Sequence, residues 1–294
     1  MKERPLEGKV AVVAGATRGA GRAIAVELGA AGATVYCTGR STRGNPSDLN
    51  RPETIEETAE RIEVRGGKGI AVRVDYTVEE EVAALFRRVK EEQGGRLDIL
   101  VNDVWGGEKL TAWGTPFWES SLADGLLMQR RAVHTHMIAS YYAAPLMVER
   151  KSGLILEITD GFDYRYRGNL YYSLAKISAI HLAESMAAEL KPHGVAAVSV
   201  TPGFLRSEEM LDHFGVTEQN WKEAVKLEPH FIMSETPAFV ARGIAALAAD
   251  PNVLQRTGGI FSSWGLSDDY GIIDADGNRP HWGRYAEEQG FYAK

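Results

Sequence analysis

A glycine-rich turn near the start of the chain constrains its fold more than any other feature of the sequence. Gly15, Gly19 and Gly21 lie between a valine-rich run at 10–13, which suits a buried parallel strand, and an alanine-rich stretch at 22–31, which suits a helix packed on that strand. Glycines let the backbone approach a ligand, and the N–H groups that begin the helix then face a pyrophosphate. The spacing G-x-x-x-G-x-G departs from the commoner dinucleotide fingerprint G-x-G-x-x-G, so a tight turn without a ligand is the alternative interpretation.

Length and charge narrow the class of protein. With 294 residues, of which 44% are hydrophobic, the chain can bury a sizeable core. No apolar run approaches the roughly 18 to 20 residues needed to cross a bilayer, so we expect a cytoplasmic protein without a membrane span. The net charge of −7 argues against nucleic acid as a partner. The single cysteine, Cys37, falls in a predicted strand and is expected to pack as a small apolar residue.

Strands and helices alternate along the chain without a linker. A capping box formed by Thr77 and Glu80 predicts the start of one helix, and Gly94 predicts its end. Thr236 followed by Pro237 predicts the start of another helix. The predicted strands cover 9–13, 33–38, 69–74, 98–102, 154–158, 195–200 and 259–263; the other predicted helices cover 52–65, 122–149 and 170–190.

This alternation predicts an α/β fold. Right-handed crossovers place helices on both faces of a parallel sheet, so we expect a doubly wound, seven-stranded, Rossmann-type sheet in a single domain over 1–294. Two aromatic-rich segments, 105–122 and 204–230, follow strands at the carboxyl edge, where such sheets bind ligands, and are predicted to line a substrate site. The aromatic residues in the tail 265–294 predict docking on the body of the protein or on a partner subunit.

The strongest chemical signal is the pair Tyr172 and Lys176. Residues four apart on a helix lie on one face, so the phenol and the ammonium point into the same cleft. Such a pair is common on solvated helices, but here it follows the fifth strand of a dinucleotide-type fold. The chain thereby resembles the short-chain dehydrogenase/reductase family over nearly its whole length. The matching residues are Gly15, Gly19, Gly21, Asp75, Asn102, Tyr172, Lys176, Pro202, Gly203 and Ser207.

The tail is most similar to the dehydrogenase/reductase member one-like branch of that family, through the runs 269–271 and 274–277. The resemblance implies that Tyr172 is the acid or base for a carbonyl or alcohol and that Lys176 lowers its pKa. Lowering a phenol pKa from about 10 to neutrality takes roughly 4 kcal/mol. The resemblance further implies cofactor contacts along the rest of the motif: Asp75 and the backbone of Tyr76 at adenine, Asn102 near the ribose, Lys176 on the ribose, and Pro202, Gly203 and Ser207 at the nicotinamide amide.

The chain also departs from the family pattern. Asp160 stands where the family has a serine about a dozen residues before the tyrosine, and Thr159 points to the other face of its strand. Ala132 occupies the place of a proton-relay asparagine, while Asp103 and Trp105 alter the turn after the fourth strand. The cofactor machinery therefore matches better than the carbonyl-orienting machinery.

The residues after the second strand predict NADP(H) as cofactor. An NAD enzyme of this fold normally places a carboxylate about 20 residues after the glycine turn, but the chain reads Thr38 to Arg43 there, without an acid. We predict that a 2′-phosphate is clamped by Arg40, by Arg18 from the glycine turn and by Arg43. Ser41, beside Arg40, and Thr17, beside Arg18, are predicted to contact the cofactor as well.

These observations favour an NADP-dependent oxidoreductase acting on a small-molecule carbonyl or alcohol. The alternative is an NADP(H)-binding sensor or scaffold with impaired catalysis, because Asp160 and Ala132 replace the family's serine and asparagine. Three roles remain open for Asp160: an ionised group that opposes Tyr172, a protonated donor to the substrate oxygen, or a structural partner of Arg165 or Arg167.

Association and metal binding complete the predictions. The helices 122–149 and 170–190 match the family's four-helix interface, so a homodimer or homotetramer is expected, with Ala179, Ala183 and Ala187 allowing close helix approach. We predict no metal site. His134 and His136 are two apart and face different ways, and the run 274–278 lacks the glycine and closing glutamate of a calcium loop.

Overall fold

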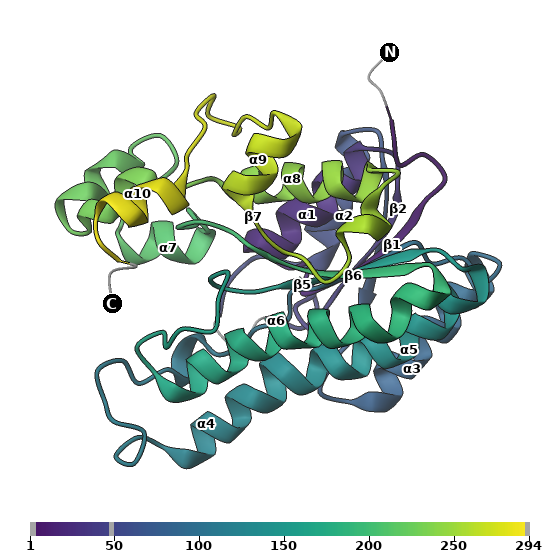
Figure 1. The fold of residues 1–294 in the computed structure, drawn as a ribbon, viewed down its shortest axis with the longest axis horizontal. Helices are drawn as coiled ribbons and strands as arrows, with labels where there is room; N and C mark the ends of the chain where they lie inside the picture. The colour runs from purple at the N-terminus through teal and green to yellow at the C-terminus, as the bar shows by residue number, and fades with distance from the viewer. Residues whose placement is uncertain (1–3, 47–49, 292–294) are drawn as a thin grey trace.

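Seven parallel strands form one sheet in the order β3-β2-β1-β4-β5-β6-β7 (Figure 1). The structure is a computed structural model that describes residues 4–46 and 50–291, so the last three residues of the predicted tail lie outside it. This topology confirms the doubly wound, single-domain fold. The strands are β1 (Val10–Ala14), β2 (Thr34–Gly39), β3 (Lys68–Arg73), β4 (Ile99–Asn102), β5 (Gly153–Ile158), β6 (Val195–Thr201) and β7 (Ile260–Ser262).

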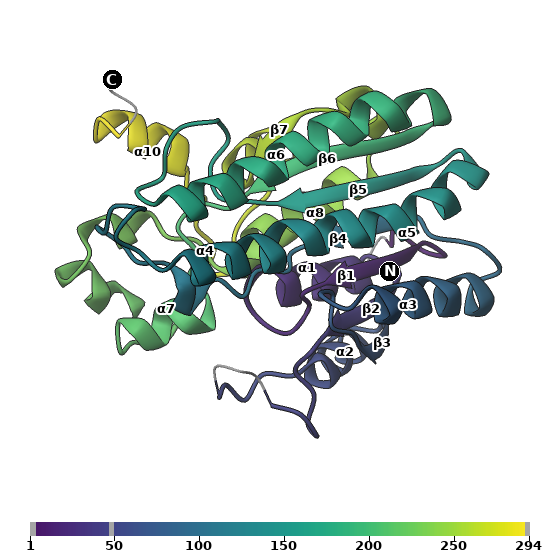
Figure 2. The same ribbon diagram turned by 90° about the horizontal axis from the view of Figure 1, so that it is seen from below.

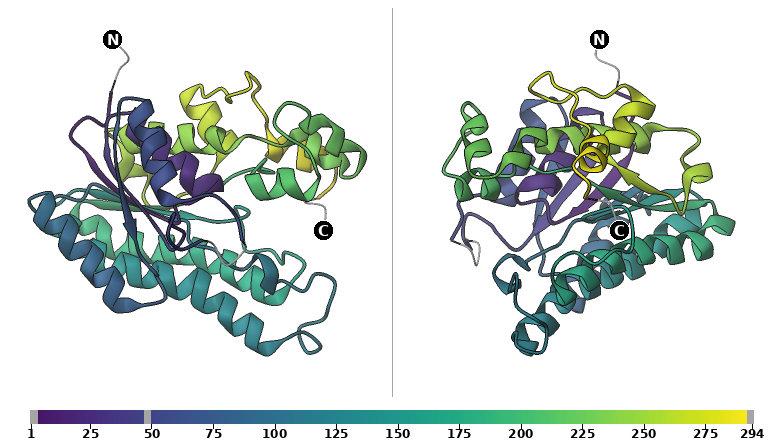
Figure 3. Two further views of the ribbon diagram at one scale, coloured as in Figure 1. Left: turned by 180° about the vertical axis from the view of Figure 1, so that it is seen from behind. Right: turned by 60° about the vertical axis from the view of Figure 1, so that its left-hand side comes forward.

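Helices cover both faces of the sheet. One face carries α1 (Gly19–Ala30), α2 (Ile55–Val64) and α8 (Pro237–Ala249); the other carries α3 (Glu79–Glu92), α5 (Thr135–Arg150) and α6 (Leu170–Leu190). Figure 2 shows the second set in front of the sheet, and the left panel of Figure 3 shows both layers from behind. Short 3₁₀ turns occupy Glu108–Leu110, Lys191–His193, Trp221–Lys226, Pro229–Met233 and Val253–Arg256.

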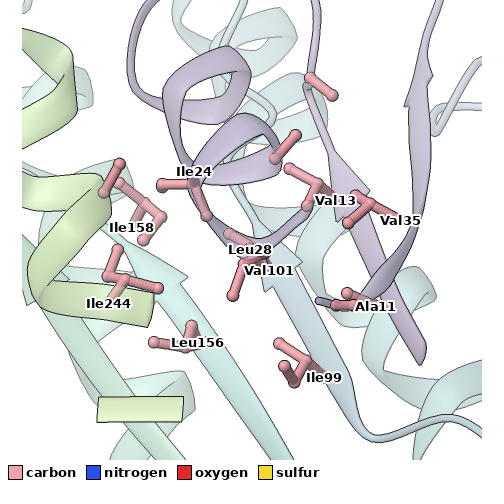
Figure 4. Packing of buried hydrophobic residues seen from close by; sticks show 14 of the residues in the cluster. Ala11, Val13, Ile24, Leu28, Val35, Ile99, Val101, Leu156, Ile158 and Ile244 are labelled. Atoms are coloured by element: carbon pink, nitrogen blue, oxygen red, sulfur yellow. The ribbon is translucent and has the colours of Figure 1, made fainter. Parts of the chain in front are cut away.

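The central strands are largely apolar because both of their faces are covered, whereas the edge strand β3 is only partly buried. In β1, Ala11 and Val13 pack with α1, whereas Val10 and Val12 join the cluster on the opposite face. Figure 4 shows the first cluster, in which Ile24 lies over the strands. Cys37 is fully buried within it, as its sequence context predicts, and burial raises the pKa of its thiol to about 12.

Two helix starts test the capping predictions. Thr236 accepts a hydrogen bond from the N–H of Ala238 and begins α8, as predicted. The Thr77 capping box is wrong: α3 begins at Glu79 without a side-chain cap. The Thr77 hydroxyl instead donates to Asp75 at 2.7 Å, which ties it to the end of β3 rather than to the helix.

The long helix predicted over 122–149 consists of three parts. α4 (Leu122–Gln129) leads into a π-helical segment, Arg130–His134, which continues as α5. Sequence periodicity does not reveal such a local widening, because it changes the phase of the helix by less than one turn.

The alanine face of α6 does not serve the role predicted for it. Ala179, Ala183 and Ala187 are buried within the protein itself, and α6 packs along β5 and β6. The small side chains therefore allow the helix to approach its own sheet, and the expectation that they form an interface between subunits is wrong.

Beyond the carboxyl edge of the sheet lies a separate group of short elements. α7 (Glu208–His213) and α10 (Trp282–Glu288) lie at the left of Figure 1, and α9 (Ser263–Tyr270) connects the sheet to the tail. The segment after β6 has its own small apolar cluster, built on Val216, Trp221, Ala224 and Phe231. In the described part of the chain no helix is long and apolar enough to cross a membrane.

Candidate active site

A cavity of about 770 Å³ opens at the carboxyl ends of the strands. Residues that follow β1, β2, β3, β4, β5 and β6 all contribute to its walls. It collects nearly every predicted site residue: Gly15, Thr17, Arg18, Gly19, Arg40, Ser41, Asp75, Tyr76, Asp160, Tyr172, Lys176, Pro202, Gly203 and Ser207. Three predicted residues, Gly21, Asn102 and Arg43, are not part of its lining.

The glycine turn needs its glycines for two different reasons. Gly15 has a φ of +89°, and a Cβ there would lie 2.4 Å from the carbonyl oxygen of Asp103. Gly21 lies below the cavity, where a Cβ would be 2.3 Å from the carbonyl oxygen of Gly15. Gly21 therefore lets α1 approach the turn closely, and its expected role in the cofactor site is one of packing rather than contact.

The N-terminus of α1 already binds an anionic group. Arg18, the residue that precedes the helix, provides no side-chain cap. The N–H of Gly19 donates to Oε2 of Glu208 at 2.8 Å, so a carboxylate from the far side of the cavity takes the position. The free N–H groups and partial positive charge of a helix start favour such an anion.

Basic residues gather at the end of the cavity next to β2 and β3. Arg40 lies 4.0 Å from Asp75, and Arg18 lies 3.5 Å from Glu108. An adjoining hollow of about 340 Å³ is lined by these residues and also by Ser41, Arg73, Lys109 and Arg131. Arg43 is not part of either lining; it binds Glu60 at 2.6 Å, which corrects its predicted place in the clamp.

The predicted adenine contacts lie at the same end. Asp75 accepts hydrogen bonds from the backbone N–H and the hydroxyl of Thr77. Burial would raise the pKa of Asp75, but the bonds from Thr77 and the charge of Arg40 outweigh it and lower the pKa. Tyr76 is buried, with its hydroxyl 2.6 Å from that of Thr38, which fixes the backbone at the cavity wall.

Asn102 belongs to a buried polar network behind the wall. Its amide donates to Glu157 at 2.7 Å and to Ser140 at 3.0 Å. Glu157 also contacts Nδ1 of His136 at 2.5 Å, and Nε2 of His136 lies 3.0 Å from the carbonyl oxygen of Val104. Asn102 therefore supports the turn after β4, and we expect it to act on the ribose region through that backbone.

The two histidines of the helix face different ways, as predicted. His134 is exposed, whereas His136 is buried in the Asn102 network. Burial would lower the pKa of His136, but the Glu157 carboxylate outweighs it and raises the pKa. In the described ranges 4–46 and 50–291, no group of three potential ligands is placed to hold a metal ion.

Tyr172 points its hydroxyl at Asp160. Asn169 caps α6 by accepting the N–H of Tyr172, and the phenol donates to Oδ2 of Asp160 at 2.7 Å. The ring packs edge-on against Trp105 and tilted against Trp113, with centroids 5.4 and 5.0 Å away. Burial and the Asp160 carboxylate together raise the pKa of Tyr172 well above its usual value.

Lys176 lies one turn further along α6. Its Nζ is 4.0 Å from the centre of the Trp105 ring, a cation–π contact, and 5.6 Å from the centre of the Tyr172 ring. Burial lowers the pKa of Lys176, although the charges of Asp160 and Asp103 oppose the change. The tryptophan found where the family has glycine thus holds the ammonium beside the phenol.

The loop after β5 fixes the direction of Asp160. Thr159 borders the cavity, but its hydroxyl donates to the carbonyl of Lys176 at 2.6 Å and so does not take the place of the family's serine. Arg167 donates to the backbone carbonyls of Asp160 and Asp163, each at 2.6 Å. Arg167 therefore holds the loop, while the Asp160 carboxylate is directed to Tyr172.

The helix that carries Ala132 still presents polar groups to the cavity. Ala132 is buried and is not part of the lining, whereas Arg131 and Thr135 are. Nη1 of Arg131 donates to the carbonyl of Gly106 at 3.0 Å. The empty relay position predicted at Ala132 therefore does not leave this wall apolar.

Sequence reasoning missed several residues that line the cavity. Glu208 follows the N-cap Ser207, and an acid in the first turn of a helix is so common that it gives no signal of a site. Trp264 comes from α9 and Trp282 from the tail. His230 comes from the segment after β6, and its Nδ1 lies 3.0 Å from the hydroxyl of Tyr285. The predicted substrate-lining segment 204–230 contains Glu208 and His230, and the expected docking of the aromatic tail covers Trp282, but neither prediction singled out these residues.

A family comparison agrees with this geometry. The model of the short chain dehydrogenase family matches residues 9–215, which include the glycine turn, the Tyr172 and Lys176 pair and the sheet from β1 to β6. The chain therefore belongs to the short-chain dehydrogenase family, whose members are oxidoreductases that use NAD(P)(H).

Particular relatives place it within that family. The chain is 36% identical to dehydrogenase/reductase SDR family member 1 of Mus musculus over 279 residues, and 36% identical to the Homo sapiens protein over 276 residues. Each alignment covers 93% of this chain and 85% of the relative. A solved structure of 7α-hydroxysteroid dehydrogenase complexed with NADH and 7-oxo glycochenodeoxycholic acid superposes with a TM-score of 0.69 at 26% identity, covering 93% of this chain and 96% of that one.

Proposed function

We propose that the protein is an NADP(H)-dependent oxidoreductase that acts on a carbonyl or alcohol substrate. The observation that supports this most directly is the convergence of the Tyr172 phenol, the Lys176 ammonium and the glycine turn on one cavity. Around these groups the cavity is large and mainly aromatic on the side away from the glycine turn, a composition suited to an apolar small molecule.

The residues present fit a dinucleotide phosphate. The N–H of Gly19 at the start of α1 donates to a carboxylate, which supports the proposal that this helix start binds the pyrophosphate. Arg18 and Arg40 would hold the 2′-phosphate, each in place of the acid that it now faces. Asp75 and Tyr76 would border the adenine, and Lys176 would bond the ribose.

The chain's own residues would manage the proton. When bound, the nicotinamide supplies or accepts the hydride. Tyr172 would give its phenolic proton to the carbonyl oxygen during reduction and take it back during oxidation. Its raised pKa keeps it protonated at neutral pH, so the proton is available for reduction, whereas oxidation needs a phenolate that is scarce. The present geometry therefore favours reduction.

One observation favours the second candidate, a cofactor-binding sensor or scaffold. The Tyr172 hydroxyl is bonded to Asp160 rather than left open to a substrate, and the acid opposes the phenolate that Lys176 would stabilise. In this alternative the cavity binds NADP(H) but turnover is slow.

Measurement of NADPH oxidation with a panel of ketones, aldehydes and quinones tests the proposal. We expect turnover of at least one class by the wild-type protein and none by Tyr172→Phe, which keeps the ring between Trp105 and Trp113. Nucleotide affinity serves as the control and should be the same in both proteins. Binding of NADPH without turnover across the whole panel would support the sensor instead.

We also propose a homo-oligomer, formed through the exposed side of α4 and α6. Leu122, Leu126, Leu170 and Leu174 on these helices are between 42% and 62% exposed, which is unusual for leucine on two neighbouring helices. Sedimentation at micromolar concentration should show a dimer or tetramer, and Leu126→Glu should shift it to monomer. A wild-type monomer would contradict this proposal.

A further inference from the structure

We propose that Glu208 is a built-in competitor of the cofactor pyrophosphate, and that its displacement links cofactor binding to the position of α7 beside the substrate. This inference rests on the proposed function, because it concerns the same cavity. It assigns to Glu208 a role in setting cofactor affinity that neither the family motif nor the sequence pattern indicates.

Both oxygens of Glu208 are engaged at the start of α1. Oε2 accepts the N–H of Gly19 at 2.8 Å, and Oε1 lies 3.7 Å from Nη1 of Arg22. Arg22 is itself buried and fixed, because it donates to the carbonyl of Thr17 and to Glu57, each at 2.8 Å. The carboxylate is thus held between a helix start and a rigid arginine.

Only one anion can take this position. The N–H of Gly19 has one hydrogen to donate and already donates it to Glu208, so a phosphate oxygen that accepts it must replace the carboxylate oxygen. A carboxylate that stayed nearby would repel the phosphate, and Glu209 and Glu108 already add negative charge at this wall. Cofactor binding therefore requires Glu208 to leave, which lowers the apparent affinity of the ligand-free protein.

The position of Glu208 in the chain connects this exchange to the other side of the cavity. Glu208 is the first residue of α7, which Ser207 caps by accepting the N–H of Met210. Met210 and Phe204 line the cavity, and Phe204 packs on Phe231 with ring centroids 5.0 Å apart. When Glu208 is released from Gly19, α7 loses this hydrogen bond to α1, so the wall that it carries is held less firmly and relies on contacts such as that of Asp212 with Arg51.

Glu208→Gln tests the inference against a matched control. The amide keeps the size of the side chain but removes its negative charge. Asp212→Asn makes the same change of charge on the same helix, at a residue that binds Arg51 at 2.9 Å and does not line the cavity. We expect Glu208→Gln to bind NADPH about 10-fold more tightly or better than wild type, and Asp212→Asn to bind as wild type does.

Two further readouts do not depend on turnover. Inorganic pyrophosphate should compete with NADPH more strongly in Glu208→Gln than in wild type. Hydrogen exchange of the amides at 208–213 should accelerate when NADPH is added to wild type, and should already be fast in ligand-free Glu208→Gln. These results together would support displacement as the link between the two sides of the cavity.

The opposite results separate the two hypotheses. Equal NADPH affinity of wild type and Glu208→Gln, or weaker binding by the variant, would overturn the role of Glu208 while leaving the proposed function intact. Unchanged exchange in α7 would overturn the coupling. If neither protein binds any nicotinamide nucleotide, the proposed function itself fails, and this inference fails with it.

Discussion

The two sides of the cavity are built in different ways. The side next to β1, β2 and β3 consists of short turns in which the backbone is held by the sheet, as at Gly15 and Tyr76. The opposite side consists of side chains from four segments that are distant in sequence, at 105–113, 160–172, 204–230 and 264–291. A backbone site is determined by the fold, whereas a side-chain site needs additional anchors to hold its segments together.

Arg206 is the main anchor of the second side. It is 2% exposed and binds Glu218, the backbone carbonyl of Ser234 and Asp276, while its guanidinium lies 4.3 Å from the centre of the Trp221 ring. These partners come from the segment after β6 and from the tail. One residue therefore joins segments whose packing the sheet itself does not determine, which makes the second side the more vulnerable to mutation.

The largest effect on the pH dependence of catalysis is expected at Asp160, where the two sides meet. In Asp160→Ser the phenol of Tyr172 loses its negatively charged neighbour, so its pKa falls toward the usual value. Below that pKa, each unit of decrease raises the phenolate fraction about 10-fold. We expect alcohol oxidation at neutral pH to increase about 10- to 100-fold, with the pH–rate profile shifted to lower pH.

The control for this measurement is Asp163→Asn, in the same loop but outside the cavity lining, which should leave the profile in place. A large loss of carbonyl reduction in Asp160→Ser would instead identify Asp160 as the working proton donor. No change in rate or profile would exclude both roles.

Breaking the anchor should affect the second side more than the first. Arg206→Met leaves Asp276 and the buried Asp274 without their cation, and loss of one partner of a buried ion pair costs about 3–5 kcal/mol. Denaturant unfolding should show this loss. At a temperature where the variant is folded, the KM for the carbonyl substrate should rise more than the dissociation constant for NADPH, and equal changes in both would refute the division into two sides.

The side of the cavity next to β1, β2 and β3 is tested by removing one positive charge and measuring nucleotide binding. We expect Arg40→Ala to weaken NADPH binding about 10- to 150-fold, the equivalent of one hydrogen bond to a charged group, and to leave NADH binding unchanged. Arg43→Ala is the control, because Arg43 pairs with Glu60 outside the cavity. Equal affinity of the wild type for NADH and NADPH would contradict a 2′-phosphate clamp.

The smallest effect concerns two buried carboxyls, Glu235 and Asp103. Burial raises the pKa of Glu235 to about 8 and that of Asp103 to about 7. Between the unfolded pKa and these values the folded state binds more protons than the unfolded state, so the free energy of unfolding falls as pH rises. Each group contributes at most about 1.4 kcal/mol per pH unit.

Thermal unfolding measured from pH 5 to 9 separates the two groups. Glu235→Gln should flatten the decline up to pH 8, and Asp103→Asn should flatten it only up to pH 7. Identical slopes in wild type and both variants would show that neither carboxyl is held protonated in the folded protein.

The fold, and the side of the cavity next to β1, β2 and β3, were largely predictable from the sequence. Valine-rich strands, regular spacing and the glycine turn each report on backbone geometry, so they predict the sheet and the position of Gly15 and Gly19 at its carboxyl edge, where both line the cavity. Local patterns failed where a side chain had a choice of partners. Thr77 binds Asp75 instead of capping α3, and Arg43 binds Glu60 instead of lining the cavity.

For the opposite side of the cavity, the sequence predicted where its segments lie but not which side chains contact one another. The segments 105–122 and 204–230 follow strands, which places them at the carboxyl edge, but the contacts of Arg206 and Glu208 join residues up to 189 positions apart. No periodicity or spacing encodes such pairs. The direction of Asp160 likewise depends on Arg167, whose hydrogen bonds to three backbone carbonyls cannot be recognised in the sequence.

The π-helical segment Arg130–His134 has a consequence for comparing this chain with its relatives. A π segment accommodates an extra residue, so a relative with a regular α-helix here would need a one-residue gap in its alignment. Each residue of an α-helix turns the face by about 100°. Depending on whether the gap is placed at the start or at the end of the segment, the same side chain of such a relative is aligned with Ala132 or with Arg131. For such a relative, equivalent residues along this helix should be assigned by superposing the two structures, because a sequence alignment without the gap matches side chains that lie on different faces.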